Sequence, residues 1–227
     1  MASTVRKTNW FAIWVSVAAV VVLIAVTGVV IAINNAASTQ AASPGESPSG
    51  SIINTDAGSV TFGDGKNKVD TYVDFLCPYC NHFEQAEGAT INQQVQAGNV
   101  TLNVHPVTIL DNGTSPAGYS SRAASAFFAV AAADPDNAYA FMQALFANQP
   151  AEQSAGLTDD QIVQIAKSAG VNVTDTLEKT IKANTFQKYA RSKQLPAAAT
   201  GTPTLVINGT MTPVTFDPQK DILANLK

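Results

Sequence analysis

The stretch Tyr72-Val73-Asp74-Phe75-Leu76-Cys77-Pro78-Tyr79-Cys80 joins a strand pattern to a helix pattern. β-branched and aromatic residues at 69–75 predict the strand. After Cys80, apolar residues recur at helical spacing until about Gly98, and residues 100–107 alternate as a further strand would. This order of strand, helix and strand predicts a parallel βαβ unit with a right-handed crossover.

Further elements are expected on both sides of this unit. A strand at 60–62 precedes it across the turn-rich Gly63-Asp64-Gly65. Strand signals return at 204–207 and 211–215, joined by the hairpin turn Asn208-Gly209. The helical segments expected are 119–133, 137–148, 158–169, 174–194 with a break, and a closing helix at 217–226. Residues 115–199 are therefore expected to form an all-helical insertion.

The chain has only two cysteines, and their spacing suits a redox couple. Residues three apart on a helix share one face, so Cys77 and Cys80 can form a disulfide. Cys77 is expected at the helix start, where unpaired N–H groups and the helix dipole stabilise a thiolate and lower its pKa. Pro78 suits the first helical position, because its missing N–H needs no partner there. Cys80, one turn later, is the expected resolving thiol.

Other roles for the cysteine pair and for the two histidines are less well supported. A structural zinc ion needs four ligands, and His82 and His105 are the only further Cys or His side chains. A purely structural disulfide would close a very short loop and stabilise little. We therefore expect no metal site, and we expect both histidines to be surface or packing residues.

Residues 10–33 carry no charge and would span roughly 36 Å as a helix, enough to cross a bilayer core of about 30 Å. Arg6 and Lys7 precede this segment, which predicts a cytoplasmic tail at 1–9 and an extracytoplasmic remainder. We therefore expect a single-pass anchor in the cell membrane. The alternative is a cleaved signal peptide, since small residues follow at 36–38, but its apolar region would be unusually long.

Residues 34–51 are rich in Ala, Ser, Pro and Gly and are expected to form a flexible linker. The folded domain is then expected over 52–227. The formal net charge of −4 and the lack of any Lys/Arg cluster argue against nucleic acid as a partner.

The stretch at 72–80, taken with Gly201-Thr202-Pro203-Thr204 before a strand, resembles the DsbA-like thiol-disulfide oxidoreductases. Membrane-tethered members of Gram-positive bacteria are the most similar in layout. The resemblance implies an α/β, thioredoxin-like fold over 52–227, with the helical subdomain inserted at about 115–199. It also implies no cofactor other than the redox-active Cys77–Cys80 disulfide.

The resemblance also implies roles for individual residues. Cys77 becomes the nucleophile, Cys80 the resolving cysteine, and Pro203 a cis-proline that faces the disulfide. Pro78, Tyr79 and Thr202 are then expected to contact substrate, with the backbone of Thr202 pairing with an extended chain.

One position departs from the family pattern. Many relatives carry a buried acid six residues before the first cysteine, where this chain has Thr71. Asp74 matches an acid found nearer the motif in the Gram-positive members, and it is a possible proton-handling group for Cys80. An equally open alternative is that Asp74 is only a solvated loop carboxylate.

The expected function is the introduction of disulfides into reduced, newly exported proteins. The resemblance implies reoxidation by a membrane partner of the DsbB or vitamin K epoxide reductase type, and the anchor would place the domain beside it in the lipid bilayer. Two alternatives remain open: a disulfide reductase or isomerase of the same fold, and a catalytically idle tethered domain that binds partner chains.

Overall fold

The computed structural model describes residues 43–227. The expected cytoplasmic tail at 1–9, the anchor at 10–33 and the part of the linker at 34–42 lie outside the described residues. Within residues 43–227 no helix is both long enough and apolar enough to span a bilayer.

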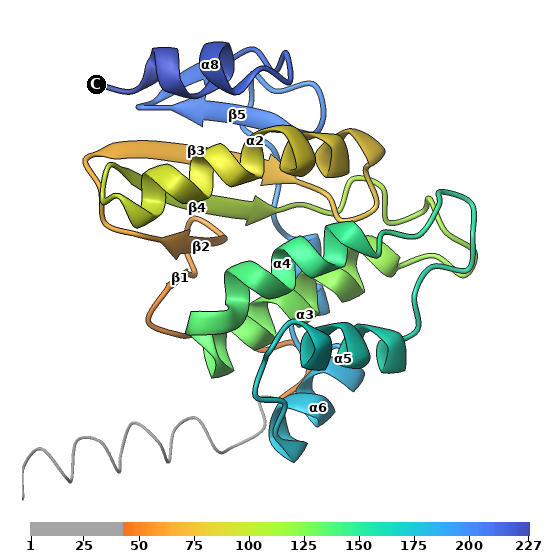
Figure 1. Ribbon diagram of the computed structural model, residues 1–227. Coiled ribbons are helices and arrows are strands. Elements are labelled where there is room, and N and C mark those ends of the chain that lie inside the picture. The colour runs from red at the N-terminus through yellow and green to blue at the C-terminus, as the bar shows by residue number, and fades with distance from the viewer. Residues whose placement is uncertain (1–42) are drawn as a thin grey trace, which may run out of the picture. The chain divides into compact units, whose positions relative to one another are not determined.

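A mixed six-stranded sheet forms the centre of the fold, with the order β1-β2-β4-β3-β5-β6. Only β3 and β4 run parallel; every other neighbouring pair is antiparallel. Helix α2 joins β3 to β4, which confirms the predicted βαβ unit, and Figure 1 shows it lying along the sheet. The strands are β1 (Ile53–Asn54), β2 (Ser59–Phe62), β3 (Asn67–Val73), β4 (Val100–Pro106), β5 (Thr204–Ile207) and β6 (Thr210–Thr212).

The central strand β3 sets the position of the cysteine motif. It pairs with β4 on one side and β5 on the other, and Val73 lies opposite Pro106 at the end of the parallel ladder. The chain therefore leaves the sheet at the carboxyl end of β3, passes through Asp74, and enters α2 (Pro78–Gln96). Strand β5 begins beside the carboxyl end of β3, since Thr204 pairs with Tyr72.

Between β4 and β5 the chain forms a group of helices, several of which lie together beside the sheet in Figure 1. They are α3 (Tyr119–Ala133), the 3-10 turn η1 (Pro135–Asn137), α4 (Ala138–Ala147), α5 (Asp159–Ser168), α6 (Asp175–Lys182) and α7 (Gln187–Arg191). The helix expected at 119–133 has those bounds. The predicted start of α5 is also confirmed, because Thr158 and Gln161 form a reciprocal capping box. The break expected within 174–194 falls between α6 and α7, where Asn184 has a φ of 49°.

The C-terminal segment differs from its prediction. The strand expected at 211–215 ends at Thr212, because the Asp221 carboxylate binds the backbone N–H groups of Thr215 and Phe216 and turns the chain away from the sheet. The single helix expected at 217–226 is split into α8 (Pro218–Asp221) and a 3-10 turn η2 (Leu223–Asn225). The Asn225 side chain donates to carbonyl oxygens of α8 and thereby ends that helix early.

One hydrophobic core joins the helical group to the cysteine loop. Four phenylalanines of the helical group are buried: Phe127, Phe128, Phe141 and Phe146. Phe75, which immediately follows Asp74, packs against Phe127 and Phe146 with ring centroids 5.7 and 5.0 Å apart. The helical group therefore packs against the loop that carries Cys77.

The described end of the predicted linker is packed against the domain. The N–H of Gly45 donates to the carbonyl oxygen of Thr185 at 3.1 Å, and Pro48 is buried. The carbonyl oxygen of Pro48 also accepts a hydrogen bond from the Thr55 hydroxyl. The part of the linker from residue 43 onward thus belongs with the folded domain.

Candidate active site

Cys77 is the N-cap residue of α2, and Pro78 occupies the first turn. No side chain caps this helix end, so the first N–H groups of α2 are available to another acceptor. Both cysteines are present as free thiols, and both are buried. The expected position of Cys77 at the helix start is confirmed.

Several donors surround the Cys77 sulfur and stabilise its thiolate. The side chain of Cys80 makes the largest contribution, and the backbone N–H groups of Tyr79 and Cys80 add to it. These interactions outweigh partial burial and lower the pKa of Cys77 to about 6. In the thiol form Cys77 Sγ donates to the carbonyl oxygen of Thr202, with 3.4 Å between sulfur and oxygen. Most Cys77 side chains are therefore thiolates at neutral pH.

Cys80 has the opposite environment. Its side chain is fully buried, and burial together with the adjacent Cys77 raises its pKa well above the ordinary value. The backbone N–H of Asp74 lies 3.5 Å from the Cys80 sulfur. The two sulfurs thus differ strongly in acidity, and Cys77 is the better nucleophile at neutral pH.

The segment before β5 brings Thr202 and Pro203 to the cysteines. The Thr202–Pro203 peptide bond is cis, as the family resemblance implied. The Thr202 carbonyl oxygen faces Cys77 Sγ, and its hydroxyl oxygen is buried without a hydrogen-bond partner. The loop before β5 therefore contacts the reactive sulfur directly.

Tyr79 supplies the exposed part of the motif. Its side chain is 65% exposed, the largest value among the exposed large hydrophobic residues of the described chain. Pro78 beside it is also exposed. An exposed aromatic ring next to a reactive sulfur can contact a partner chain directly.

Asp74 is fully buried, so its interpretation as a solvated loop carboxylate is wrong. Its Oδ1 accepts hydrogen bonds from the N–H of Leu76 at 2.8 Å and the hydroxyl of Ser120 at 2.6 Å. Its Oδ2 accepts from the N–H of Leu110 at 2.9 Å. Burial outweighs these bonds and raises the pKa of Asp74. The carboxyl group ties the cysteine loop to the β4–α3 loop and to α3.

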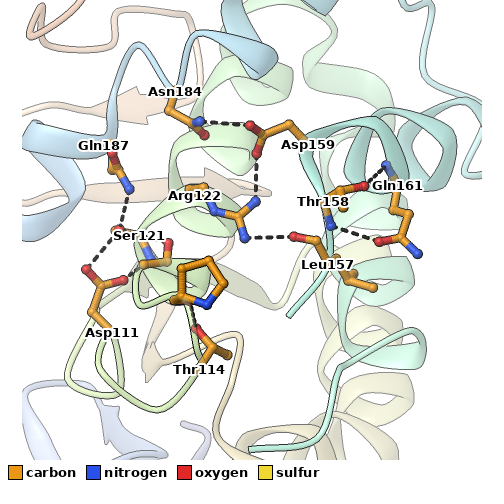
Figure 2. Close-up of polar contacts among 12 residues, drawn as sticks. Asp111, Thr114, Ser121, Arg122, Leu157, Thr158, Asp159, Gln161, Asn184 and Gln187 are labelled. Atoms are coloured by element: carbon orange, nitrogen blue, oxygen red, sulfur yellow. Dashed lines mark hydrogen bonds and ion pairs between the residues drawn. The ribbon is translucent and has the colours of Figure 1, made fainter. Parts of the chain in front are cut away.

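Sequence reasoning missed the residues that support Asp74. Ser120 lies in the first turn of α3, and the β4–α3 loop that carries Leu110 is held by Asp111, which accepts from both the N–H and the hydroxyl of Ser121. Figure 2 shows this contact together with Gln187, which donates to the Ser121 hydroxyl. The only sequence signal was a pair of serines at the start of an otherwise apolar helix.

A second group of polar contacts in Figure 2 fastens the helices to one another. Arg122 donates to the Asp159 carboxylate at 2.7 Å and to the carbonyl oxygen of Leu157 at 2.7 Å. Asn184 donates to the other oxygen of Asp159. These contacts link α3, the start of α5 and the end of α6, and they fix the helical group from which Ser120 reaches Asp74.

Neither histidine reaches the cysteines. His105 is buried, bonds to Asp70 at 2.9 Å and stacks on Tyr72. His82 is exposed and stacks on Phe216. Over residues 43–227 no group of three or more His, Cys, Asp or Glu side chains is arranged to bind a metal ion.

Comparison with known sequences places most of the folded part in one family. A sequence profile described as thioredoxin matches residues 56–224. The serine/threonine-protein kinase PknE of Mycobacterium tuberculosis is 29% identical over 110 residues, which cover 47% of this chain and 19% of the kinase. This chain therefore matches only about a fifth of the length of that curated relative.

Solved structures of disulfide enzymes share the fold. Oxidised DsbA of M. tuberculosis superposes with a TM-score of 0.61 at 30% identity, covering 69% of this chain and 86% of that one. Reduced DsbG of the same organism, a disulfide bond oxidoreductase, gives 0.61 at 29% identity over 69% and 81% of the two chains. MdbA of Corynebacterium matruchotii, at 20% identity, gives 0.61 over 86% and 96% and shows the shared fold alone.

Proposed function

Because this chain belongs to the thioredoxin family and is similar to DsbA of M. tuberculosis, we propose that it introduces disulfides into exported proteins through Cys77 and Cys80. The observation that carries the proposal is the difference in acidity between the two sulfurs. Cys77 has a pKa of about 6 at the start of α2, whereas the pKa of the buried Cys80 is raised.

The reaction is two successive thiol-disulfide exchanges. A substrate thiolate attacks Cys77 Sγ of the oxidised enzyme, the Cys77–Cys80 bond breaks, and Cys80 leaves as a thiolate that takes up a proton. A second substrate thiolate then attacks the substrate sulfur of the mixed disulfide, and Cys77 leaves as a thiolate. The substrate gains one disulfide, and the enzyme gains the two electrons.

The proposed oxidising direction is supported by the form of the enzyme that the site stabilises. Hydrogen bonds to the Cys77 thiolate exist only in the reduced form, so they favour reduction of the enzyme and oxidation of its substrate. A low pKa also makes Cys77 the better leaving group in the second exchange.

Substrate recognition is proposed to use the surface around Cys77. The Thr202 carbonyl oxygen contacts the Cys77 sulfur, and Pro78 and Tyr79, which follow Cys77 in the chain, are exposed. The backbone of Thr202 would pair with an extended substrate segment, which gives recognition that tolerates many sequences. Asp74 has less support as a proton acceptor for Cys80, because the contact to that sulfur comes from the backbone N–H of Asp74.

We also propose an extracytoplasmic location. The uncharged segment at 10–33 would anchor the chain in the cell membrane, with the preceding Arg6 and Lys7 on the cytoplasmic side. Reduced enzyme would then be reoxidised by a membrane partner of the DsbB or vitamin K epoxide reductase type. A shared membrane raises the effective concentration of the two proteins.

The direct test adds the purified, oxidised protein to reduced, unfolded ribonuclease A and follows the appearance of ribonuclease disulfides and activity. We expect disulfide formation at a rate well above that of air oxidation. If the protein forms no disulfides but readily reduces insulin, the reductase alternative replaces the oxidase.

Cysteine variants distinguish the two enzymatic functions, oxidase and reductase, from a domain that only binds partner chains. Cys77→Ala should abolish disulfide formation. In Cys80→Ala, the Cys77 thiolate should attack oxidised substrates and form mixed disulfides that persist, because no Cys80 thiol remains to displace the bound sulfur. If both variants retain the full biological activity of the wild type, the domain acts by binding alone and the enzymatic proposal fails.

A further inference from the structure

The side chain of Gln149 joins the helical group to the cysteine loop. Gln149 lies two residues beyond the end of α4, directly after the C-cap residue Asn148, and is half-buried. Its Nε2 donates to the carbonyl oxygen of Phe75 at 2.9 Å and to that of Cys77 at 3.0 Å. Two carbonyl acceptors can be satisfied only by the NH2 end of the amide, so the chemistry fixes the orientation of this side chain.

These two carbonyl groups lie on either side of Leu76, in the short segment between β3 and α2. On its other side the same segment is held by Asp74, whose carboxylate accepts from the N–H of Leu76 and whose carbonyl oxygen accepts from the N–H of Cys77. The Asp74 carboxylate thus accepts from the N–H of Leu76, while Gln149 donates to the carbonyl oxygens of the residues on either side of it. Together these hydrogen bonds fix the segment.

The carbonyl group of Cys77 is also part of the helix start. It accepts from the N–H groups of Cys80 at 3.0 Å and Asn81 at 3.2 Å, which are the first intrahelical bonds of α2. The third donor to this oxygen is Gln149. A side chain 72 residues away in sequence therefore fixes the residue that carries the reactive sulfur relative to the first turn of the helix.

We propose that Gln149 is a positioning residue for Cys77, which it holds so that the backbone N–H groups of Tyr79 and Cys80 stay directed at the sulfur. The role of Gln149 in catalysis rests on the proposed exchange reaction. Its effect on the position and acidity of Cys77 does not depend on the direction of exchange or on the substrate. Gln149 does not touch the reacting sulfur. It acts through the backbone of the loop, as the two hydrogen bonds to carbonyl groups require.

The test replaces the amide with an apolar side chain of similar size, Gln149→Leu. The readout is the pKa of Cys77 in the reduced protein, measured from thiolate absorbance at 240 nm against pH. Loosening the loop weakens donation from the helix N–H groups to the thiolate, so the pKa should rise by about half a unit or more. At pH 8 this is roughly a threefold fall in the equilibrium constant for oxidation of glutathione, or about 15 mV.

Asn148→Leu is the matched control. Asn148 is the exposed neighbour, and its side chain donates to the carbonyl oxygen of Ala144 within α4 without touching the cysteine loop. This control should leave the pKa of Cys77 unchanged. Gln149→Met is a second variant, because its side chain is uncharged, similar in size and unable to donate to the two carbonyl oxygens, so the pKa of Cys77 should rise as in Gln149→Leu.

The outcomes separate positioning from simple stabilisation. If folded Gln149→Leu has a lower melting temperature but an unchanged Cys77 pKa and glutathione equilibrium, the residue is structural only and the proposal is overturned. If the pKa of Cys77 rises in the variant while the wild type forms no disulfides in ribonuclease, positioning holds and the oxidase function fails. If Leu fails to fold, the same measurement on Gln149→Met decides.

Discussion

Asp74→Ala tests how strongly the buried carboxyl group holds the cysteine loop. The change removes the acceptor of two backbone N–H groups, those of Leu76 and Leu110, and of the Ser120 hydroxyl. Each buried N–H left without a partner costs about 1–3 kcal/mol, and the hydroxyl can rotate toward another acceptor. Burial also destabilises the ionised carboxylate of the wild type. The alanine variant lacks this unfavourable contribution, which offsets part of the cost. The expected net loss is about 3 kcal/mol, which lowers the melting temperature by roughly 6–12 °C in a domain of this size.

Asp74→Asn refines the same test, since the two carboxyl oxygens have different partners. An amide oxygen in the place of Oδ1 keeps the bonds from Leu76 and Ser120, whereas an NH2 group in the place of Oδ2 faces the N–H of Leu110. One unsatisfied pair of donors should cost about 1–3 kcal/mol, less than the alanine variant. Urea unfolding followed by circular dichroism measures both losses.

The pH dependence of stability gives an independent check. Burial raises the pKa of Asp74, so the folded protein keeps this proton at pH values where the unfolded chain has lost it. The contribution of Asp74 to stability is therefore greatest at low pH and falls as pH rises from the ordinary pKa to the raised one. Asp74→Asn should lack this fall. Equal free energies of unfolding for wild type and Asp74→Ala, within about 0.5 kcal/mol, would refute the assigned role of the carboxyl group.

Three further predictions concern other parts of the fold. Cys80→Ala should raise the pKa of Cys77 above 6, because the Cys80 side chain is the largest source of its stabilisation; an unchanged thiolate titration would contradict this. Glu87 is fully buried, its carboxyl oxygens have no hydrogen-bond partner, and burial beside Asp221 raises its pKa to about 7. Its contribution to stability should therefore decline as pH rises from the ordinary value through 7, and Glu87→Gln should flatten that decline in urea unfolding from pH 5 to 9. Phe75→Ala should lose about 3–5 kcal/mol in the same unfolding assay, since its ring joins the loop to the helical core; a loss below 1 kcal/mol would show that the two parts pack independently.

Much of the fold could be predicted because local signals agree with the tertiary structure. The βαβ unit has both its strand and helix periodicities, and α5 has a complete capping box at Thr158 and Gln161. The start of α2 at Cys77 followed from the spacing of the cysteines and from Pro78. In each case the residues that decide the element lie within a few positions of it.

The rest depends on contacts between distant segments, which periodicity does not encode. Ser120 reaches Asp74 across 46 residues and Gln149 reaches Cys77 across 72, so neither role was visible in the sequence. The closing helix was predicted too long for a related reason. The Asn225 side chain donates to the carbonyl oxygens of Lys220 and Asp221 and competes with a continuous helix over 217–226.

The central claim is that Cys77 is the acidic, attacking thiol of the pair. The most direct measurement alkylates the reduced protein with limiting iodoacetamide from pH 4 to 10 and identifies the modified cysteine by mass spectrometry. The account predicts modification at Cys77, with a rate that reaches half its maximum near pH 6, and little at Cys80. A midpoint near that of an ordinary thiol, or preferential modification of Cys80, would contradict it.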